Sequence, residues 1–165
     1  MFSVGVYLRS HSVKAHVRLA SPADVEQLSQ LRRELWPDVV DEENTREVTA
    51  ILGGERIGTL PLVIFVAEGE DGALIGFIEV GLRSHADGCD PRLPVGFVEG
   101  WFVRERYRRQ RIGAQLAAAA EKWARSQGCI EMASDALIDN SISQRAHECL
   151  GFEVVDRCVH YRKTL

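Results

Sequence analysis

The segment between residues 103 and 114, VRERYRRQRIGA, carries five arginines against one glutamate. The stretch before it, residues 95 to 103, is apolar and β-prone, and a helical apolar stripe begins near Ile112. A strand that runs through a basic loop into a helix leaves the first N–H groups of the helix unpaired. Helix N-terminal amides and guanidinium groups both bind phosphate oxygens. The segment therefore predicts a site for a small ligand with several phosphates, and a solvated basic loop is the alternative.

Two carboxylates follow or interrupt strand-like stretches. Glu99 lies within the strand before the arginine loop, and Asp135 follows a short strand expected at residues 129 to 133. Open α/β sheets bind ligands at such strand ends, and a carboxylate there can hold an ammonium and accept its proton. The alternatives are a strand-edge carboxylate for Glu99 and a turn or cap residue for Asp135. His147, on an expected helix, is a candidate acid or a structural hydrogen-bonding group.

An acidic stretch follows Trp36, with five carboxylates against one arginine between residues 38 and 47. With the aromatic ring beside it, this stretch predicts a mouth for a cationic substrate, in which we expect Asp41, Glu42 and Glu43 to take part. The alternative for the acids is a solvated helix start, which favours carboxylates. The alternative for Trp36 is ordinary packing at a helix end.

The composition excludes several classes of protein. A chain of 165 residues that is 45% hydrophobic can form one domain, and its net charge of -4 argues against a nucleic-acid partner. No apolar run approaches the ~20 residues that span a bilayer, and the first fifteen residues lack the order of a secretory signal. The four cysteines form no Cys-x-x-Cys pair, so we expect no metal site and a cytoplasmic setting.

The order of apolar patterns predicts a mixed sheet. Helices are expected at residues 21–36, 112–128 and 140–150, and a short helix has Val48, Ile51 and Leu52 as its weak apolar face. Strands are expected at residues 16–20, 62–67, 73–82, 95–103, 129–133, 152–156 and 159–164. Gly96 and Gly100 should mark a bulge or a close backbone approach. In the last helix, Ile142 and Cys149 should face the core, whereas Ser143 and His147 should face a ligand. We expect a loose extension over residues 1–15 and one α/β (α+β) domain over 16–165.

Two motifs resemble those of a known superfamily. RRQRIGA, residues 108–114, resembles the acetyl-CoA pyrophosphate loop of GNAT-superfamily N-acetyltransferases, except that Arg111 replaces the usual first glycine. The ending SQRAHECLGFEVVDRCVHYRK resembles the last block of that superfamily. LRRELWP, DGCD, FVEGWFV and EMASD, with this ending, are similar to aminoglycoside 6'-N-acetyltransferases.

The resemblance implies a fold, a cofactor and a reaction. It implies a GNAT fold whose mostly antiparallel sheet is splayed in the middle and flanked by helices. It implies direct transfer of acetyl from acetyl-CoA to the 6'-amine of an aminoglycoside, without a covalent enzyme intermediate. Such a reaction would confer antibiotic resistance. The resemblance also implies that the protein is a homodimer. The residues that it places around acetyl-CoA are Phe102, Val103, Arg108, Arg109, Gln110, Arg111, Ile112, Gly113, Ala114, Asn140 and Ser143.

The acceptor amine that the resemblance supplies gives the polar residues named above their roles. Glu99, Asp135 and His147 are the candidate catalytic residues, and His147 stands where many members of the superfamily have a tyrosine. Trp36, Asp41, Glu42, Glu43, Glu99 and Asp135 are the residues expected to bind the substrate. Two rival functions stay open: acetylation of a polyamine, another small amine or a protein amine, and a non-catalytic acetyl-CoA-binding module.

Overall fold

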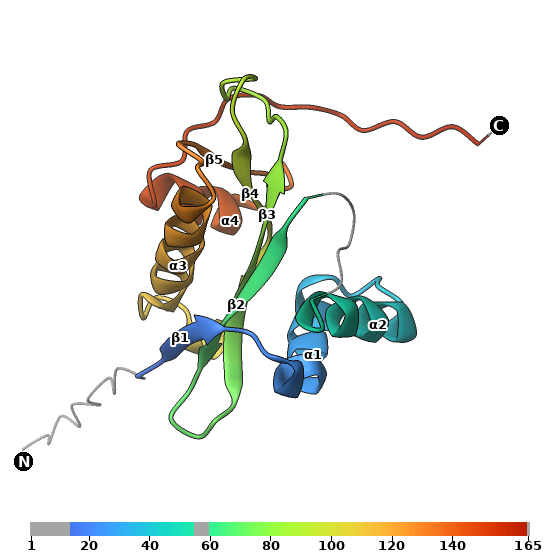
Figure 1. Cartoon of the computed structure of the whole chain (residues 1–165), viewed down its shortest axis with the longest axis vertical. Helices are drawn as coiled ribbons and strands as arrows, with labels where there is room; N and C mark the ends of the chain where they lie inside the picture. The colour runs from blue at the N-terminus through green and yellow to red at the C-terminus, as the bar shows by residue number, and fades with distance from the viewer. Residues whose placement is uncertain (1–13, 55–59, 165) are drawn as a thin grey trace, which may run out of the picture.

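The computed structural model describes residues 14–54 and 60–164, and these form a five-stranded mixed sheet with helices on both faces (Figure 1). The strands are β1 (His16–Leu19), β2 (Leu62–Glu68), β3 (Leu74–Arg83), β4 (Val95–Val103) and β5 (Met132–Ser134). The helices are α1 (Val25–Leu35), α2 (Asp41–Leu52), α3 (Ile112–Ser126) and α4 (Ser141–Cys149), with short 3-10 helices η1 (Pro22–Asp24) and η2 (Glu105–Tyr107). Residues 1–13 of the expected extension lie outside the described residues.

The sheet has the order β1-β2-β3-β4-β5. Each of the first three pairs is antiparallel, and β5 runs parallel to β4. The parallel pair is joined through α3, because parallel neighbours need a crossover connection. The predicted mixed, mostly antiparallel sheet flanked by helices is therefore confirmed.

The sheet separates two hydrophobic cores. On one face, α3 packs Ile112, Leu116 and Ala120 against residues of β3 and β4 such as Ile78 and Val98. On the other face, α1 and α2 cover Ile64, Val66 and Phe77. Both faces of β3 are therefore covered, with Phe77 in one core and its neighbour Ile78 in the other, which explains why this strand is almost continuously buried.

A β-bulge interrupts the pairing of β3 with β4. Val80 pairs with Val98 but Glu79 pairs with Gly100, so Glu99 is an extra residue on β4. A Cβ atom at position 100 would lie 2.5 Å from the indole of Trp36, so only glycine fits there. The bulge and close approach predicted from the sequence are confirmed at this position.

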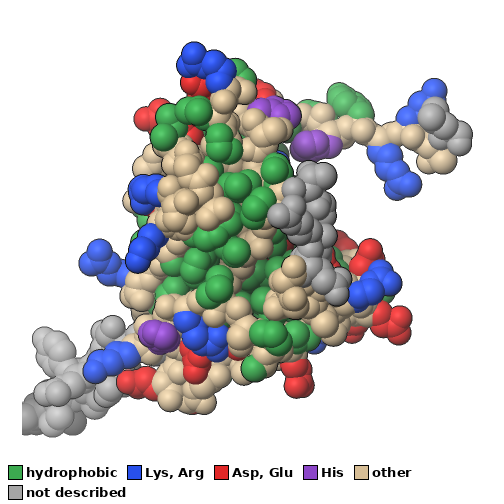
Figure 2. All heavy atoms as spheres, viewed as in Figure 1, with side chains coloured by type: hydrophobic (Ala, Val, Ile, Leu, Met, Phe, Trp, Pro, Cys, Tyr) green, Lys and Arg blue, Asp and Glu red, His purple; other side chains and the backbone are tan. Residues whose placement is uncertain are grey.

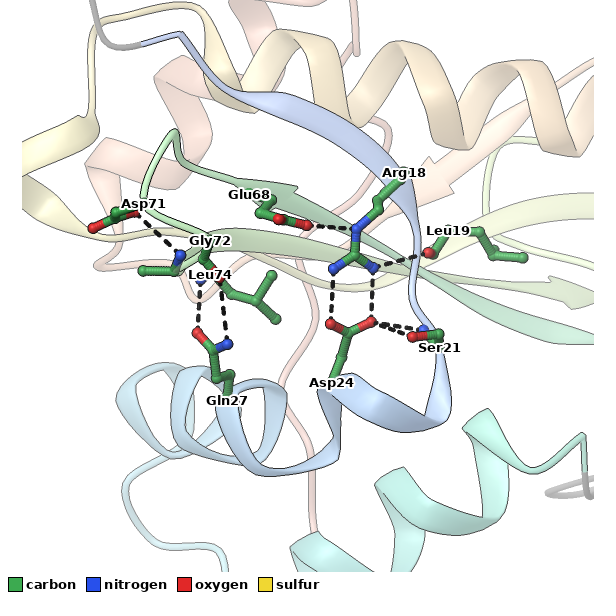
Figure 3. Close-up of polar contacts among 10 residues, drawn as sticks. Arg18, Leu19, Ser21, Asp24, Gln27, Glu68, Asp71, Gly72 and Leu74 are labelled. Carbon is green, nitrogen blue, oxygen red and sulfur yellow. Dashed lines mark hydrogen bonds and ion pairs between the residues drawn. The ribbon is translucent and has the colours of Figure 1, made fainter.

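An ion-pair network fastens the start of α1 to the sheet (Figure 3). Arg18 of β1 donates two hydrogen bonds to Asp24, at 2.7 and 2.8 Å, and a third to Glu68 of β2 at 2.7 Å. Asp24 also accepts a bond from the backbone N–H of Ser21. Gln27 completes the attachment, because its side-chain oxygen accepts the backbone N–H of Leu74.

The predicted closing strands, 152–156 and 159–164, are wrong in this structure. Residues 152–164 pair with no strand among the described residues. The segment runs past the loop after β3, where Val155 lies close to Gly88, and then leaves the body of the protein (Figures 1 and 2). A strand needs a partner, and here the segment crosses a loop instead of lying beside β5.

Two local expectations also need correction. The strand expected at residues 129–133 comprises residues 132–134 instead (β5), because the N–H of Cys129 bonds to the carbonyl of Ala124 and closes the turn after α3. The faces of α4 are reversed: Ile142 is 61% exposed, whereas Ser143 and His147 are partly buried against the sheet side. Across the described ranges, no helix has the length and apolar character needed to cross a membrane.

Asp24 should contribute to stability in a pH-dependent way. Hydrogen bonds from Arg18 lower the pKa of Asp24 to about 2, from an ordinary value near 3.8. A lowered carboxylate pKa stabilises the fold above the ordinary pKa, and this contribution is lost as pH falls through the folded value. We expect Asp24→Asn to lower the free energy of unfolding by ~2 kcal/mol at pH 7 and by ~1 kcal/mol at pH 3 in urea titrations.

The matched control for this variant is Glu26→Gln, which removes the same charge from an exposed position of the same helix start. Exposed substitutions of this kind change stability by less than ~0.5 kcal/mol. An Asp24→Asn variant as stable as the control at pH 7 would show that the Arg18 network does not hold α1.

Candidate active site

The two candidate carboxylates lie on neighbouring strands where their pairing stops. Val98 pairs with Ser134, the last residue of β5, whereas β4 continues to Val103. Glu99 and Asp135 are the next residues on the two strands. The structure thus places them at corresponding positions, at the start of a wedge between β4 and β5.

The surroundings of the two carboxylates differ. Arg83 holds Glu99 through two hydrogen bonds, from Nη2 at 2.7 Å and from Nε at 3.1 Å. The same guanidinium lies 3.3 Å from the centroid of the Phe97 ring. Asp135 is exposed, and none of the described residues donates a hydrogen bond to its carboxylate. Asp135 is therefore the carboxylate that can accept a proton without first giving up a partner.

The backbone of β4 offers amide groups to this wedge. The N–H of Arg104 bonds to the carbonyl of Ile75 in β3, so the alternation of an antiparallel ladder directs the N–H of Phe102 toward β3 as well. The N–H groups of Trp101 and Val103 then point toward the β5 side. Phe102 and Val103 are both among the residues that the resemblance implies around acetyl-CoA, and of their two N–H groups only that of Val103 points away from β3.

The loop before α3 has an unusual backbone. Arg109 and Arg111 adopt positive φ angles of 60° and 64°, the left-handed region that non-glycine residues rarely enter. Arg111 is the N-cap of α3, and its side chain makes no capping bond, so the first-turn amides from Ile112 to Ala114 are not capped by a side chain. The position where the resembling family has glycine is thus one where glycine would be unstrained.

The arginines of this loop have different neighbours. Arg104 pairs with Glu34 of α1, and Arg108 donates to the carbonyl of Val103. Arg109 and Arg111 are exposed beside the uncapped amides of α3. Gln110 is partly buried, and its side chain lies 3.4 Å from the carbonyl of Arg106. The positive charge next to the helix start therefore comes mainly from positions 109 and 111.

Gly113 packs so closely on Trp101 that a larger residue would not fit there, even without a ligand. A Cβ atom there would lie 2.9 Å from the indole of Trp101. Trp101 packs in the core on this face, and its Nε1 is buried without a hydrogen-bond partner among the described atoms. A larger residue at position 113 would therefore displace Trp101, whose own backbone faces the wedge, in addition to crowding the helix amides.

The first turn of α4 is built around hydrogen bonds. The side chain of Asn140 accepts the backbone N–H of Ser143 and caps the helix. His147 Nδ1 lies 2.8 Å from the carbonyl of Ser143, which can only accept, so Nδ1 carries a proton. Nε2 then accepts from the hydroxyl of Ser134, at 2.9 Å. Both ring nitrogens are used internally, and these contacts favour the structural alternative over an acid role.

Trp36 ends α1 beside the bulge. Its ring packs edge-on against Phe77, with centroids 6.1 Å apart, and Arg32 lies 5.1 Å from its centroid. The ring also contacts the backbone at Gly100. The packing alternative is therefore realised on one side of a partly buried ring, and a role as substrate platform stays a prediction.

The acidic turn is not brought together with Asp135. Asp41, Glu42 and Glu43 are exposed in the first turn of α2, where Arg33 lies 3.5 Å from Asp41. This helix packs on α1 and touches β2, whereas Asp135 follows β5 at the far edge of the sheet. No group of three or more metal-ligating side chains occurs in the part of the chain that the structure describes.

Comparison with known proteins agrees with this geometry. Residues 25–152 match the acetyltransferase (GNAT) family. The chain belongs to this family. The fold and the family resemblance predicted from the sequence are therefore confirmed.

Individual relatives whose names specify one enzyme activity align with most of the chain. A protein of Serratia marcescens named aminoglycoside N(6')-acetyltransferase type 1 is 44% identical over 136 residues, which are 82% of this chain and 89% of the relative. A Klebsiella aerogenes protein with the same name is 38% identical over 149 residues, 90% of this chain and 96% of its own.

Solved structures of similar proteins show the same architecture. AAC(6')-Iy, in complex with the bisubstrate analogue CoA-S-monomethyl-acetylneamine, superposes with a TM-score of 0.82 at 36% identity and covers 92% of this chain and 99% of its own. AAC(6')-Ih from Acinetobacter baumannii superposes with a TM-score of 0.80 at 30% identity over the same shares.

Several residues at this site were not singled out from the sequence. Arg83, the partner of Glu99, and Glu79, buried beside the bulge, lie on one face of β3 at alternate positions. A charged residue within an otherwise apolar strand, as in LIGFIEVGLR, is the signal that could have found Glu79. No local pattern indicated that Trp101 packs against Gly113, because that contact joins β4 to α3.

The left-handed backbone at Arg111 predicts that glycine is more stable than alanine at this position, the reverse of their order within a helix. Within helices alanine is more stable than glycine, but a left-handed residue with a Cβ atom costs ~1–2 kcal/mol. Arg111→Gly and Arg111→Ala both remove the guanidinium, so their difference isolates the backbone. We expect the glycine variant to be more stable by ~1 kcal/mol in urea unfolding. Equal stability, or a more stable alanine variant, would show that position 111 is not strained.

Proposed function

We propose that this protein transfers the acetyl group of acetyl-CoA to the 6'-amine of an aminoglycoside and so confers resistance. The observation that carries the proposal is the wedge between β4 and β5: their pairing stops at Val98 and Ser134, just before Glu99 and Asp135, and β4 continues into the loop that leads to the uncapped start of α3. Relatives that share 31% to 44% identity with this chain carry the corresponding name.

In this proposal acetyl-CoA binds from α3 into the wedge. The first-turn amides of Ile112, Gly113 and Ala114 hold the pyrophosphate, with the loop from Arg108 to Arg111 supplying positive charge. The pantetheine arm continues between the strands, where the backbone N–H groups of Trp101 and Val103 replace the missing strand partner. Asn140 and Ser143, at the start of α4, border its other side.

The reaction needs a free amine and a stabilised oxyanion. A carboxylate, directly or through water, takes one proton from the substrate ammonium, and the nitrogen lone pair then attacks the thioester carbonyl. Fixed N–H donors of β4 stabilise the tetrahedral oxyanion. The attacking nitrogen loses its second proton to solvent as the intermediate collapses to the amide and the C–S bond breaks. The thiolate leaves and takes up one proton from solvent, and the carboxylate returns the first proton to solvent. We assign Asp135 as the proton acceptor and Glu99 as an anchor for the ammonium.

The remaining substrate contacts surround this centre. Trp36 lies beside the bulge that carries Glu99, and its exposed side would cover a sugar face. The acidic turn of α2, Asp41 to Glu43, begins shortly after Trp36 and would attract a polycation at longer range. His147 completes the wall of the site through Ser134.

A panel of amines tests this proposal against its rivals. The protein is mixed with acetyl-CoA and an aminoglycoside, a polyamine or a lysine-containing peptide, and the free thiol of CoA is measured. We expect release with the aminoglycoside, and mass spectrometry should place the acetyl group on the 6'-nitrogen. Release only with another amine would identify a different acceptor, and binding of acetyl-CoA without release would identify a non-catalytic module.

Variants of the two carboxylates should separate their roles. Asp135→Asn keeps shape but removes the proton acceptor, so we expect kcat to fall by about 10²-fold with little change in the aminoglycoside KM. Glu99→Gln should mainly raise the KM. Asp139→Asn, an exposed acid farther along the same loop, is the matched control and should stay within about twofold of the wild type. Unchanged turnover in Asp135→Asn would remove this assignment.

We also propose that the protein is a cytoplasmic homodimer. The C-terminal segment exposes Val154, Val155, Val159 and Tyr161, each at least 62%. Leu137 and Ile138, in the loop after β5, are more than 70% exposed. A second copy that pairs its C-terminal segment with the outer edge of β5 and packs on this loop would bury both sets. All four cysteines are free, which fits a reducing compartment.

Light scattering at micromolar concentration measures the oligomeric state directly. We expect a mass twice that of the 18.4 kDa chain. Truncation after Phe152 removes the exposed apolar segment and should yield a monomer. A monomeric full-length protein, or a dimer that survives the truncation, would contradict this assembly.

A further inference from the structure

β3 carries one buried carboxylate next to the proposed site. Glu79 is 4% exposed and lies between Ile78 and Val80, which both face the core under α3. Its own side chain therefore faces α1, on the same side as Phe77. A carboxylate buried this deeply needs a partner to stay ionised.

The guanidinium nearest to Glu79 is already engaged elsewhere. Arg32 Nε lies 3.7 Å from Glu79 Oε2, beyond hydrogen-bond distance, whereas Arg32 Nη2 donates to Glu47 at 2.8 Å. Among the described atoms, Arg32 Nε, Arg32 Nη1 and Glu79 Oε2 have no hydrogen-bond partner. One guanidinium thus stands between two carboxylates and bonds the more exposed one, so Glu79 is poorly compensated as an anion.

A third carboxylate lies across the bulge. Glu79 pairs in register with Gly100, directly after Glu99, and Glu99 is held by Arg83. The groups that face Glu79 are therefore Arg32 from α1, Glu47 from α2 and the Glu99 pair from β4. Within the described residues this cluster holds three carboxylates and two guanidiniums, which leaves one negative charge in excess when all are ionised.

The physical consequence is that Glu79 titrates near neutrality. Burial raises the pKa of Glu79 to about 7, Arg32 opposes this rise, and Glu47 and Glu99 add to it. Below that pH the carboxyl is neutral, and above it the site gains a second negative charge beside Glu99. A cation that docks there favours the ionised form and lowers the pKa again.

We propose that Glu79 sets the preference of the site for cationic substrates: it keeps a proton while the site is empty and releases it to solvent when a substrate ammonium docks beside Glu99. This inference rests on the proposed function. A neutral ligand of similar shape gains nothing from Glu79, because it does not stabilise the carboxylate. Glu79 is thus a specificity-determining residue that does not touch the reacting atoms.

Steady-state kinetics test the proposal through a ratio. The aminoglycoside KM is measured for the wild type and for Glu79→Gln, which resembles the protonated form. Dividing the KM of Glu79→Gln by that of the wild type cancels the titration of the substrate's own amines. We expect this ratio to be near one at pH 6 and about three to ten at pH 8, because one pKa unit of coupling equals tenfold in affinity. The kcat of the variant should stay within about twofold of the wild type.

Glu47→Gln is the matched control with the opposite effect. It removes the carboxylate that occupies Arg32, so Arg32 becomes free to bond Glu79 and favours its ionised form. The pH midpoint of the aminoglycoside KM should then move below that of the wild type. The KM for acetyl-CoA should not follow either transition, because that ligand is anionic and is held at α3. A midpoint that does not move in Glu47→Gln would contradict the role of Arg32.

A direct titration keeps the test independent of how the variants fold. The carboxyl carbon of Glu79 is followed by NMR in the wild type bound to CoA, with and without saturating neamine. We expect its midpoint near pH 7 and a decrease of about one pH unit with neamine. A midpoint that neamine leaves unchanged, in a protein that acetylates aminoglycosides, overturns this inference alone. A protein that acetylates no aminoglycoside overturns the proposed function and this inference together.

Discussion

The bulge at Glu99 and Gly100 is the constraint on which the site depends. One extra residue in β4 changes which side chains face α1, and it places Glu99 over Gly81 instead of in the core. The bulge persists because Trp36 fills the space that a side chain at position 100 would need. Burial of aromatic surface at the end of α1 therefore decides the course of β4, and with it the point where β4 and β5 separate.

The same constraint divides the charges of the site. The negative groups gather on the α1 side of β4, where Glu99, Glu79 and Glu47 meet Arg83 and Arg32. The positive groups at 109 and 111 gather where β4 leads into α3. A ligand that is anionic at one end and meets a cationic acceptor at the other is oriented by this separation. A chain with a net charge of -4 can hold a polyphosphate only through such local segregation.

The parts predicted well from sequence were those with local causes. The strand, basic loop and helix around residues 95–126 could be predicted because apolar period, turn residues and helix start lie next to one another. Gly100 and Trp36 were both singled out, but their contact could not be, since it joins residues far apart in the chain. The prediction of which face of α4 is buried was wrong for a related reason. Hydrophobicity placed Ile142 inside, whereas the contacts of His147 with Ser134 of β5 and with the Trp101 ring of β4 turn the other face toward the sheet.

The closing strands failed because strand formation is a property of pairs. Residues 152–164 have the composition of strands, with Val154, Val155 and Val159 among them, but they pair with no strand in the part of the chain that the structure describes. The composition of a segment indicates whether it can form a strand, but not which strand edge it will pair with. The same reasoning applies to Glu79: a carboxylate in an apolar strand marks a site, but only the positions of Arg32, Glu47 and Glu99 show that its charge is left uncompensated. The excess of carboxylates around this buried group is a property of the folded chain, and no local sequence pattern contains it.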